Sequence, residues 1–398
     1  MRLFLFVFFS LYGAAHVYAF LKARAALGFR FKGGLSLVLL MLLMVLSPAL
    51  IRILERGGHP LAARLLAYTG YTWLGVFFLF LSLSLLIDLF RLLIFLGEIA
   101  RKKGFPALSL STRAAFFVPL FLSVALAILG YFEALDIHPE KIVFQSPKIP
   151  REMGRLRIAQ VSDVHLGMIV RGTRLSRILR PVKEFEPDIL VSTGDLVDGQ
   201  ASDLASITPL LREIRPRYGK FAVVGNHEYY GGLGQSLQVL KNAGFTLLRG
   251  KRVDVAGISI AGADDPAGEY FGLHRDIPDS QLLSSTFPGR FVLFLKHRPL
   301  VERDALSLFD LQLSGHTHTG QIFPFTLLTR LYYRLDSGYL PKGAYLYVSG
   351  GAGTWGPPIR LLAPAGVTLI ELVHGEETKV LREGKVEALR SLPRGASR

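Results

Sequence analysis

SDVHLG, residues 162–167, decides the fold class of this chain, because it stands where a predicted strand, residues 156–163, meets a polar turn. Beyond it, short runs rich in Val, Ile and Leu alternate with amphipathic segments up to about residue 374. Such alternation predicts interleaved strands and helices, and these build layered domains around a sheet. We therefore expect residues 156–374 to form an α+β domain.

The polar residues of this domain gather after predicted strands. They occur in SDVHLG and in STGDLVDG (192–199), GNHEYY (225–230), KHRP (296–299) and SGHTHTG (314–320). Five of the ten histidines of the chain lie in these motifs. Side chains two positions apart on a strand point to the same face, so we expect Asp163 and His165 to enter one site. The same holds for His316 and His318.

These motifs supply carboxylate, amide and imidazole donors without sulfur, since the chain has no cysteine. This donor set favours divalent ions of intermediate hardness, which include Mn, Fe and Zn. Seven candidate ligands are too many for one ion and suit two ions that share a carboxylate: Asp163, His165, Asp195, Asn226, His297, His316 and His318. Two such cations can hold the attacking and leaving oxygens of a displacement at phosphorus, with a bridging hydroxide as the nucleophile. The absence of cysteine also excludes a thiolate nucleophile, a zinc finger and a disulfide scaffold.

Other polar residues in the motifs are candidates for supporting roles. His227 is the candidate general acid for the departing alkoxide, with Glu228 as its orienting partner. Asp198 could support a ligand from outside or act as a turn residue. Arg298 and Arg360 are candidate contacts for the phosphate of the substrate. Taken singly, every ligand has an alternative, because an Asp can cap a helix and a buried His can be structural.

The ordered set DVH, GD, GNHE, H and GHTH resembles the calcineurin-like metallophosphoesterase superfamily over about residues 156–373. SDVHLG, GHTHTGQI and YVSGGAGTWGPPIRL (347–361) are similar to its membrane-associated bacterial branch, although Thr319 stands where that branch usually has glycine. The resemblance implies a four-layer αββα sandwich. It implies that His227 acts from outside the coordination shell, and that the ligands are Asp163, His165, Asp195 and His318 for one metal and Asp195, Asn226, His297 and His316 for the other.

The first 132 residues have a different composition. Four stretches, of 19, 19, 23 and 19 residues, carry no charged side chain: 3–21, 33–51, 65–87 and 114–132. Each is long enough to cross a hydrocarbon core of ~30 Å as a helix, so residues 1–132 are expected to form an all-α transmembrane region. A buried helical bundle and, for 3–21, a cleavable signal peptide are the alternatives. Residues 133–155 are then a linker, and residues 375–398 a polar tail.

Positive charges in the loops predict the orientation of these helices. The loops 22–32 and 88–113 hold nine Lys and Arg residues, against six on the opposite side of the membrane. Because basic loops prefer the cytoplasm, we expect a multi-pass bacterial membrane protein whose catalytic domain is extracytoplasmic. His16 and the pair Asp88 and Arg91 are polar exceptions in or beside the stretches, and we expect structural roles for them rather than an ion path.

The sequence thus favours a membrane-anchored, two-metal phosphoesterase that hydrolyses a phosphate mono- or diester. One alternative is a pyrophosphatase of a nucleotide-linked lipid of the UDP-diacylglucosamine type with a cytoplasmic catalytic domain. Another is a non-catalytic receptor or transporter with a metal-binding domain. The expected partners are the lipid bilayer and a phosphoester that could be lipid-linked. Nucleic acid is not expected, because residues 1–150 carry +9 of the net charge of +15, and the oligomeric state is open.

The segment 322–345, which follows His318 closely, is unusually aromatic and apolar for a loop. It could line the substrate groove, or dip toward the bilayer and select an amphiphilic phosphoester. The interpretation we favour from the sequence is that Phe323, Leu327 and Leu331 pack on the sandwich.

Overall fold

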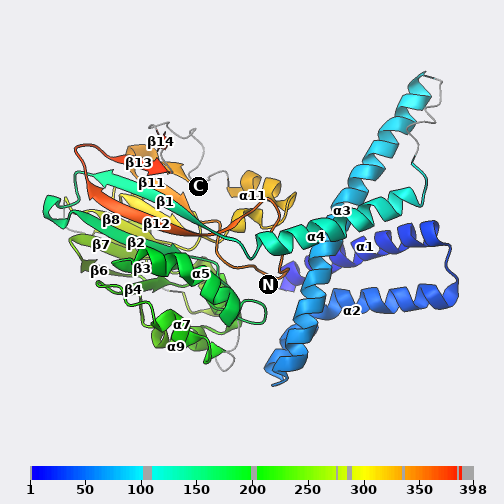
Figure 1. The fold of residues 1–398 in the computed structure, drawn as a ribbon, viewed down its shortest axis with the longest axis horizontal. Helices are drawn as coiled ribbons and strands as arrows, with labels where there is room; N and C mark the ends of the chain where they lie inside the picture. The colour runs from blue at the N-terminus through cyan, green and yellow to red at the C-terminus, as the bar shows by residue number, and fades with distance from the viewer. Residues whose placement is uncertain are drawn as a thin grey trace. The chain divides into compact units, whose positions relative to one another are not determined.

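The computed structural model describes residues 2–101, 110–198, 204–274, 277–284, 289–333, 337–382 and 385–387. The chain divides into two units (Figure 1). The helical unit comprises Met1–Phe132 and Gly356–Leu361, and the sandwich unit comprises Glu133–Trp355 and Leu362–Arg398. Each unit has its own hydrophobic core.

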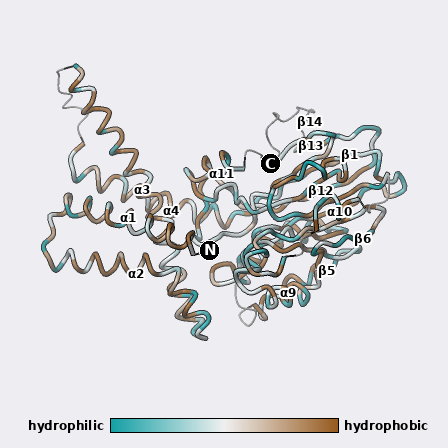
Figure 2. The backbone as a smooth tube through the Cα atoms, turned by 180° about the vertical axis from the view of Figure 1, so that it is seen from behind, coloured by the Kyte–Doolittle hydropathy of each residue, from teal (hydrophilic) through white to brown (hydrophobic). Residues whose placement is uncertain are grey.

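Long apolar helices build the helical unit: α1 (Arg2–Leu27), α2 (Phe31–Arg56), α3 (Pro60–Arg101) and α4 (Ala114–Glu133). All four are long and apolar enough to cross a membrane, and each contains one of the predicted uncharged stretches. Figure 2 shows apolar residues along most of their length. The prediction of four apolar helices ahead of the α+β domain is confirmed, and α3 continues well beyond the predicted stretch 65–87.

His16 has both ring nitrogens engaged inside the helical unit. Its ring stacks on that of Phe77, with the ring centroids 3.8 Å apart. Trp73 donates a hydrogen bond from Nε1 to His16 Nε2 at 3.0 Å. The other ring nitrogen, Nδ1, lies 2.8 Å from the carbonyl oxygen of Tyr12. These contacts hold the imidazole between α1 and α3, which supports the structural role predicted for it.

Asp88 joins two helices instead of neutralising its neighbour in sequence. Its carboxylate accepts hydrogen bonds from Lys22 Nζ at 2.7 Å and from the Tyr18 hydroxyl at 2.6 Å, both on α1. The ion pair with Lys22 makes Asp88 part of a bridge between α1 and α3, whereas the sequence predicted Arg91 as its partner. An acidic and a basic residue on facing helices can satisfy each other where a single helix offers no second polar partner.

Residues 356–361, which lie between β11 and β12 in the sequence, belong to the helical unit. The backbone N–H of Arg360 donates to the carbonyl oxygen of Gly130 at 2.9 Å. A Cβ atom on Gly130 would lie 2.5 Å from Ile359 Cγ2, so this close approach needs glycine in α4. The side chain of Arg360 is fully buried there. Its burial in the helical unit does not favour the predicted contact with the phosphate of a substrate.

The sandwich unit contains two sheets. The first has the strand order β14-β13-β1-β12-β2-β3-β4-β5, and its strands are β1 (Ile137–Ser146), β2 (Arg155–Val161), β3 (Ile189–Thr193), β4 (Lys220–Val223), β5 (Phe245–Leu247), β12 (Ala365–His374), β13 (Lys379–Arg382) and β14 (Lys385–Glu387). The second has the order β10-β11-β9-β8-β7-β6, with β6 (Lys251–Val255), β7 (Ile258–Gly262), β8 (Val292–Leu295), β9 (Leu311–Ser314), β10 (Gly338–Tyr339) and β11 (Tyr345–Val348). Strands β2, β3 and β4 run parallel, as do β7, β8 and β9.

Helices connect the strands of the two sheets. They are α5 (Gly172–Phe185), α7 (Thr208–Arg212), α8 (Asn226–Gly231), α9 (Leu233–Asn242), α10 (Asp279–Ser284) and α11 (Phe325–Tyr333), with 3-10 turns η2 (Arg151–Met153), η3 (Pro266–Phe271), η4 (Arg303–Ala305), η5 (His318–Gly320) and η6 (Pro341–Gly343). Helices α5 and α9 pack on the first sheet (Figure 1). Helix α10 packs on the second sheet through Leu282 and Leu283. The main core lies between the sheets, where the ring of Phe144 lies 5.3 Å from that of Phe291. The predicted four-layer αββα sandwich is confirmed.

Two segments expected to be irregular belong to the first sheet. The predicted linker 133–155 contains β1, which pairs with β12 along its whole length and places Ile142 and Phe144 in the core. Its mixed charge hid this strand, and Pro139 is tolerated because β13 pairs only with Ile142–Gln145. The predicted tail 375–398 contributes β13 and β14, and its residues 383–384 and 388–398 lie outside the described residues.

Residues 253–262 comprise the end of β6 and the whole of β7, joined by a turn at Ala256 and Gly257, both with positive φ. Glycine after an apolar run is a turn signal, and here it reverses the chain into an antiparallel pair.

Candidate metal centre

The candidate ligands all follow the carboxyl ends of neighbouring strands. Asp163 lies two residues after β2, Asp195 two after β3, and Asn226 begins α8 after β4. In the second sheet, His297 and His316 follow β8 and β9 in the same way. Parallel strands open their carboxyl ends at one edge, where loops can build a site. Donor atoms of three residue groups there lie within 4.8 Å of one another: Asp163, His165 and His318; His165, Asp195 and His227; and Asp195, His297 and His316.

Five of the candidate ligands adopt left-handed backbone conformations. The φ angles are positive at Asp163 (52°), His165 (53°), Asp195 (50°), His316 (71°) and His318 (48°). The strand-alternation argument for their convergence was therefore wrong, because these pairs lie in turns beyond the strand ends. A left-handed conformation of a non-glycine residue costs about 1–3 kcal/mol and is found mainly where function needs it. Such a concentration of strained residues marks this edge as functional.

One half of the site brings the donor atoms of four side chains close together. His297 Nδ1 lies 2.8 Å from the carbonyl oxygen of Thr193, which fixes an N–H there and directs Nε2 into the site. That Nε2 faces Asp195 Oδ2 at 3.2 Å, Asn226 Oδ1 at 3.2 Å and His316 Nδ1 at 3.1 Å. Oxygen and nitrogen acceptors this close need a cation between them. A divalent ion fits this donor set.

The pKa shifts of these side chains also favour a cation among them. Burial would lower the pKa of His297, but the Asp195 carboxylate raises it to about 10. Burial and the positive charge of His297 lower the pKa of His316 to about 2. Burial would raise the pKa of Asp195, but His297 and His227 hold it well below its usual range. A metal ion bound to His297 would have to displace the proton that the raised pKa favours.

The other half of the site has the same character. His165 Nε2 and His318 Nε2 lie 2.9 Å apart, and His318 Nε2 lies 3.6 Å from Asp163 Oδ1. Asp195 Oδ2 is 4.0 Å from His165 Nε2 and so faces both halves. Burial raises the pKa of Asp163, which again favours a cation beside it. The structure brings all seven predicted ligands together, and they fit two cations that share Asp195.

Glycines let the motif loops approach one another. A Cβ atom on Gly225 would collide with the Asp195 carboxylate. At Gly194, which has a φ of 96°, a Cβ would lie 2.7 Å from His297 Nδ1 and from the backbone nitrogen of Gly225. The glycine before Asp195 and the one before Asn226 are therefore part of the site, because no larger residue leaves room for the ligands.

Asp198, not Glu228, stands beside the candidate general acid. His227 is nearly buried, and its Nδ1 lies 2.9 Å from Asp198 Oδ1. The backbone N–H of His227 donates to Asp195 Oδ1 at 2.8 Å. Asp198 also approaches His165 Nδ1 at 3.8 Å. The predicted pairing of Glu228 with His227 is wrong, and Asp198 has the outer supporting position that the sequence left open.

Glu228 holds the ligand loops in place. Its fully buried carboxylate accepts hydrogen bonds from the backbone N–H groups of Asp195 (3.0 Å), Val197 (3.0 Å) and Gly225 (2.7 Å). Burial, together with the charge of Asp195, raises the pKa of Glu228 to about 7, and the N–H donors oppose this rise. Glu228 thus ties the loop after β3 to the loop after β4.

We expect Glu228→Gln to destabilise the sandwich unit by about 2–3 kcal/mol. The amide N–H of glutamine would face at least one of the backbone N–H groups that donate to the carboxylate, and that hydrogen bond would be lost. The thermal unfolding of the purified full-length protein would measure this loss. The matched control is Glu269→Gln, at an exposed position of η3, which should change stability little. An equal effect of both variants would contradict the role given to Glu228.

The other predicted phosphate contact, Arg298, is already paired. Its guanidinium donates to both carboxylate oxygens of Asp265, at 2.8 and 3.1 Å. Asp265 was not predicted from the sequence, and its place in DDP after β7 gave no metal-ligand spacing. Two aromatic residues near the ligands were missed as well. The ring of Tyr333 lies 5.7 Å from that of His316, and the ring of Trp355 lies 5.8 Å from that of His227.

Known proteins are similar in sequence to this part of the chain. A family model described as calcineurin-like phosphoesterase matches residues 156–320. An uncharacterized metallophosphoesterase of Aquifex aeolicus is 40% identical over 258 residues, which cover 64% of this chain and 98% of the relative. The chain belongs to the calcineurin-like metallophosphoesterases.

Two further metallophosphoesterase relatives extend the comparison. One from Campylobacter jejuni is 36% identical over 258 residues, covering 64% of this chain and 68% of the relative. A protein of Danio rerio, described as a transmembrane protein with metallophosphoesterase domain, is 33% identical over 273 residues. This match covers 64% of this chain and 61% of the relative. Metallophosphoesterases of this family typically bind two divalent metals, and the His and Asp clusters described above fit that number.

Proposed function

We propose that this metallophosphoesterase is a membrane-anchored hydrolase that cleaves a phosphate mono- or diester with two divalent cations. The observation that carries the proposal is the position of Asp195 Oδ2, which faces donor nitrogens of both halves of the site. The ligands for one cation would be Asp163, His165, Asp195 and His318, and for the other Asp195, Asn226, His297 and His316. When bound, the cations supply the electrophilic clamp and the activated water that such a hydrolysis needs.

The chain's own residues provide the geometry and the proton. The carboxylate of Asp195 is oriented by the N–H of His227 and approached by the imidazole of His297. As the water oxygen forms its bond to phosphorus, the ester P–O bond breaks, and the departing alkoxide takes a proton. His227 is placed to donate that proton from Nε2, because its Nδ1 faces Asp198. His227 then regains a proton from solvent.

Metal dependence tests the proposal directly. We expect detergent-purified protein, stripped of metal by a chelator, to lose hydrolysis of bis(p-nitrophenyl) phosphate and p-nitrophenyl phosphate. Activity should return on addition of Mn, Fe(II) or Zn, because oxygen and nitrogen donors without sulfur suit these ions. Metal analysis of the restored protein should give about two ions per chain. Hydrolysis that survives complete removal of metal would contradict the proposal.

The anchor would be the four apolar helices, with the sandwich unit on the extracytoplasmic side. The support is the excess of Lys and Arg in loops 22–32 and 88–113, which favours those loops in the cytoplasm. Reporter fusions within loop 88–113 and after residue 132 should report opposite sides of the membrane. A cytoplasmic report after residue 132 would reverse the orientation and leave the proposed reaction unchanged.

A further inference from the structure

Helix α11 turns its apolar side chains away from the protein. Leu327, Leu328, Leu331 and Tyr332 are 56%, 59%, 72% and 77% exposed, whereas Thr326 is buried. A helix of a water-soluble domain buries its apolar face, whereas α11 exposes most of its apolar side chains. The expectation that Phe323, Leu327 and Leu331 pack on the sandwich is wrong, because all three side chains are exposed.

Contacts at both ends of α11 hold the helix close to the metal centre. The turn η5, which contains His318, leads into it, and Gly320 has a φ of 78°. A Cβ on Gly320 would lie 2.5 Å from Thr326 Cα, so the helix lies directly against the ligand loop. At the other end of α11, the ring of Tyr333 lies 5.7 Å from that of His316. The exposed apolar face therefore stands beside the site and not at a distant surface.

Trp355 extends this apolar surface past the general acid. About half of its side chain is exposed, and its ring lies 5.8 Å from that of His227. Its backbone N–H donates to Gln321 Oε1 at 2.9 Å, which ties it to the segment between η5 and α11. Exposed Trp and Tyr side chains are typical of the boundary between hydrocarbon and water. A bilayer surface suits Trp355 and Tyr332 better than bulk water does.

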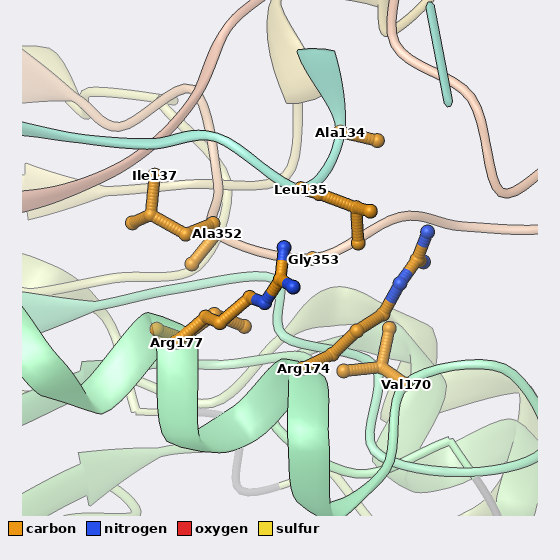
Figure 3. A pocket seen from close by; sticks show the side chains of 9 residues that line it. Ala134, Leu135, Ile137, Val170, Arg174, Arg177, Ala352 and Gly353 are labelled. Atoms are coloured by element: carbon orange, nitrogen blue, oxygen red, sulfur yellow. The ribbon is translucent and has the colours of Figure 1, made fainter. Parts of the chain in front are cut away.

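Positive charge accompanies this surface. Arg330 is exposed and is the one charged residue of α11. Arg174 of α5 donates to Thr354 Oγ1 at 3.2 Å, next to Trp355. Figure 3 shows Arg174 and Arg177 rising from α5 toward Leu135. With Ala352 and Gly353 they line a hollow of about 10 Å³. The hollow holds about one water-sized group, so the arginines would meet an anion at its rim.

The hollow beside α5 is lined in part by the residues that follow helix α4. Ala134 and Leu135, which line the hollow in Figure 3, directly follow the last residue of α4, Glu133. Helix α4 is one of the four helices able to cross a membrane. Anionic headgroups attract arginines within about a Debye length of the bilayer surface. Arg174 and Arg177 of α5 thus line the same hollow as the two residues that follow α4, and their charge complements the phosphates of lipids.

We propose that α11 is an interfacial helix that inserts Leu327, Leu328, Leu331 and Tyr332 into the headgroup boundary of the bilayer and holds the metal centre at its surface. The substrate class that follows, which rests on the proposed function, is a phosphoester carried by an amphiphile with its acyl or alkyl chain in the bilayer. A helix with an apolar face and a basic residue lies in the interface plane in this way. The ester group would meet the site without leaving the membrane.

The absence of cysteine allows a direct measurement of insertion. Leu331→Cys, labelled with an environment-sensitive fluorophore, is placed in the full-length protein in vesicles of phosphatidylcholine and phosphatidylglycerol. The matched control is Lys251→Cys on β6, which is exposed in the second sheet. We expect doxyl-labelled lipid to quench the Leu331 label and aqueous iodide to quench the Lys251 label. This readout needs no turnover, so it stands apart from the proposed reaction.

Two results would overturn the insertion of α11. Equal quenching of both labels by iodide would mean that α11 faces water. Shielding of the Leu331 label from iodide, without quenching by doxyl lipid, would mean that protein covers the helix.

The substrate class is tested with a pair of esters that share the reacting group. Hexadecyl p-nitrophenyl phosphate, dissolved in the vesicles, is compared with methyl p-nitrophenyl phosphate in solution. We expect the double variant Leu327→Ser and Leu331→Ser to lower the ratio of kcat/KM for the long ester to that for the short ester by about tenfold. An unchanged ratio would overturn the substrate class. Hydrolysis of neither ester by the wild type would count against the proposed function and leave the labelling result valid.

Discussion

Asp195→Asn is expected to lower phosphoester hydrolysis by at least about 10³-fold, the largest effect of any single substitution in the sandwich unit. The carboxylate faces His165 in one half of the site and His297 in the other, at 4.0 and 3.2 Å. Asparagine keeps the shape of the side chain but removes its charge and replaces one oxygen by an N–H donor. That donor would point at imidazole nitrogens arranged to meet a cation.

The same variant separates metal loss from unfolding. Metal analysis after exposure to Mn should give clearly fewer ions per chain than in the wild type. Asp254→Asn is the control, since Asp254 lies on β6, accepts a hydrogen bond from Ser259 and contacts no candidate ligand. Both variants should remain folded by circular dichroism. An Asp195→Asn protein that keeps two metals and full turnover would contradict the shared carboxylate.

Most of the candidate ligands come with a local signal in the sequence. Asp195 and Asn226 both follow a glycine, and the structure shows why: a side chain at Gly194 or Gly225 would collide with the site. His297 carries no such signal and was identified only by its order among the other motifs. Polar residues that follow predicted strands therefore predict which edge of the sandwich carries the site.

The reason for convergence was not predictable from strand geometry. Asp163 and His165 both have left-handed backbones, so their side chains meet through turns and not through the alternation of a strand. The sequence does not show which aspartate or histidine will be left-handed, because neighbouring loops of the folded chain enforce these conformations. Glu228 shows this, since its carboxylate binds three backbone N–H groups that only the folded chain brings together.

Strand β1 and helix α11 were misjudged for opposite reasons. β1 has charges and a proline at its open end but sends Ile142 and Phe144 into the core, which only its pairing with β12 reveals. α11 has the composition of a core helix, and we expected Leu327 and Leu331 to be buried. In the structure, α11 instead packs through Thr326 against Gly320 and leaves these leucines exposed. Composition predicts apolar surface, whereas the tertiary structure decides what covers it.

His227→Asn is expected to slow hydrolysis by about 10²-fold for substrates with a poor leaving group, because the departing alkoxide would lose its proton donor. The effect should be much smaller for p-nitrophenyl esters, since p-nitrophenolate leaves without protonation. The measurement is the ratio of rates on phenyl and p-nitrophenyl phosphodiesters for wild type and variant. His138→Asn, at an exposed position of β1, is the control and should leave both rates unaltered.

This leaving-group test distinguishes a proton donor from a structural residue. His227 also supports the site, since its backbone N–H binds Asp195 Oδ1 at 2.8 Å, but asparagine retains that N–H. A residue that only positioned Asp195 would slow both esters equally and would lower the metal content. Asp198→Asn should reproduce the pattern of His227→Asn more weakly, because Asp198 lies 2.9 Å from His227 Nδ1 and orients the ring. Equal slowing of both esters by His227→Asn would show that the proton of the leaving group comes from elsewhere.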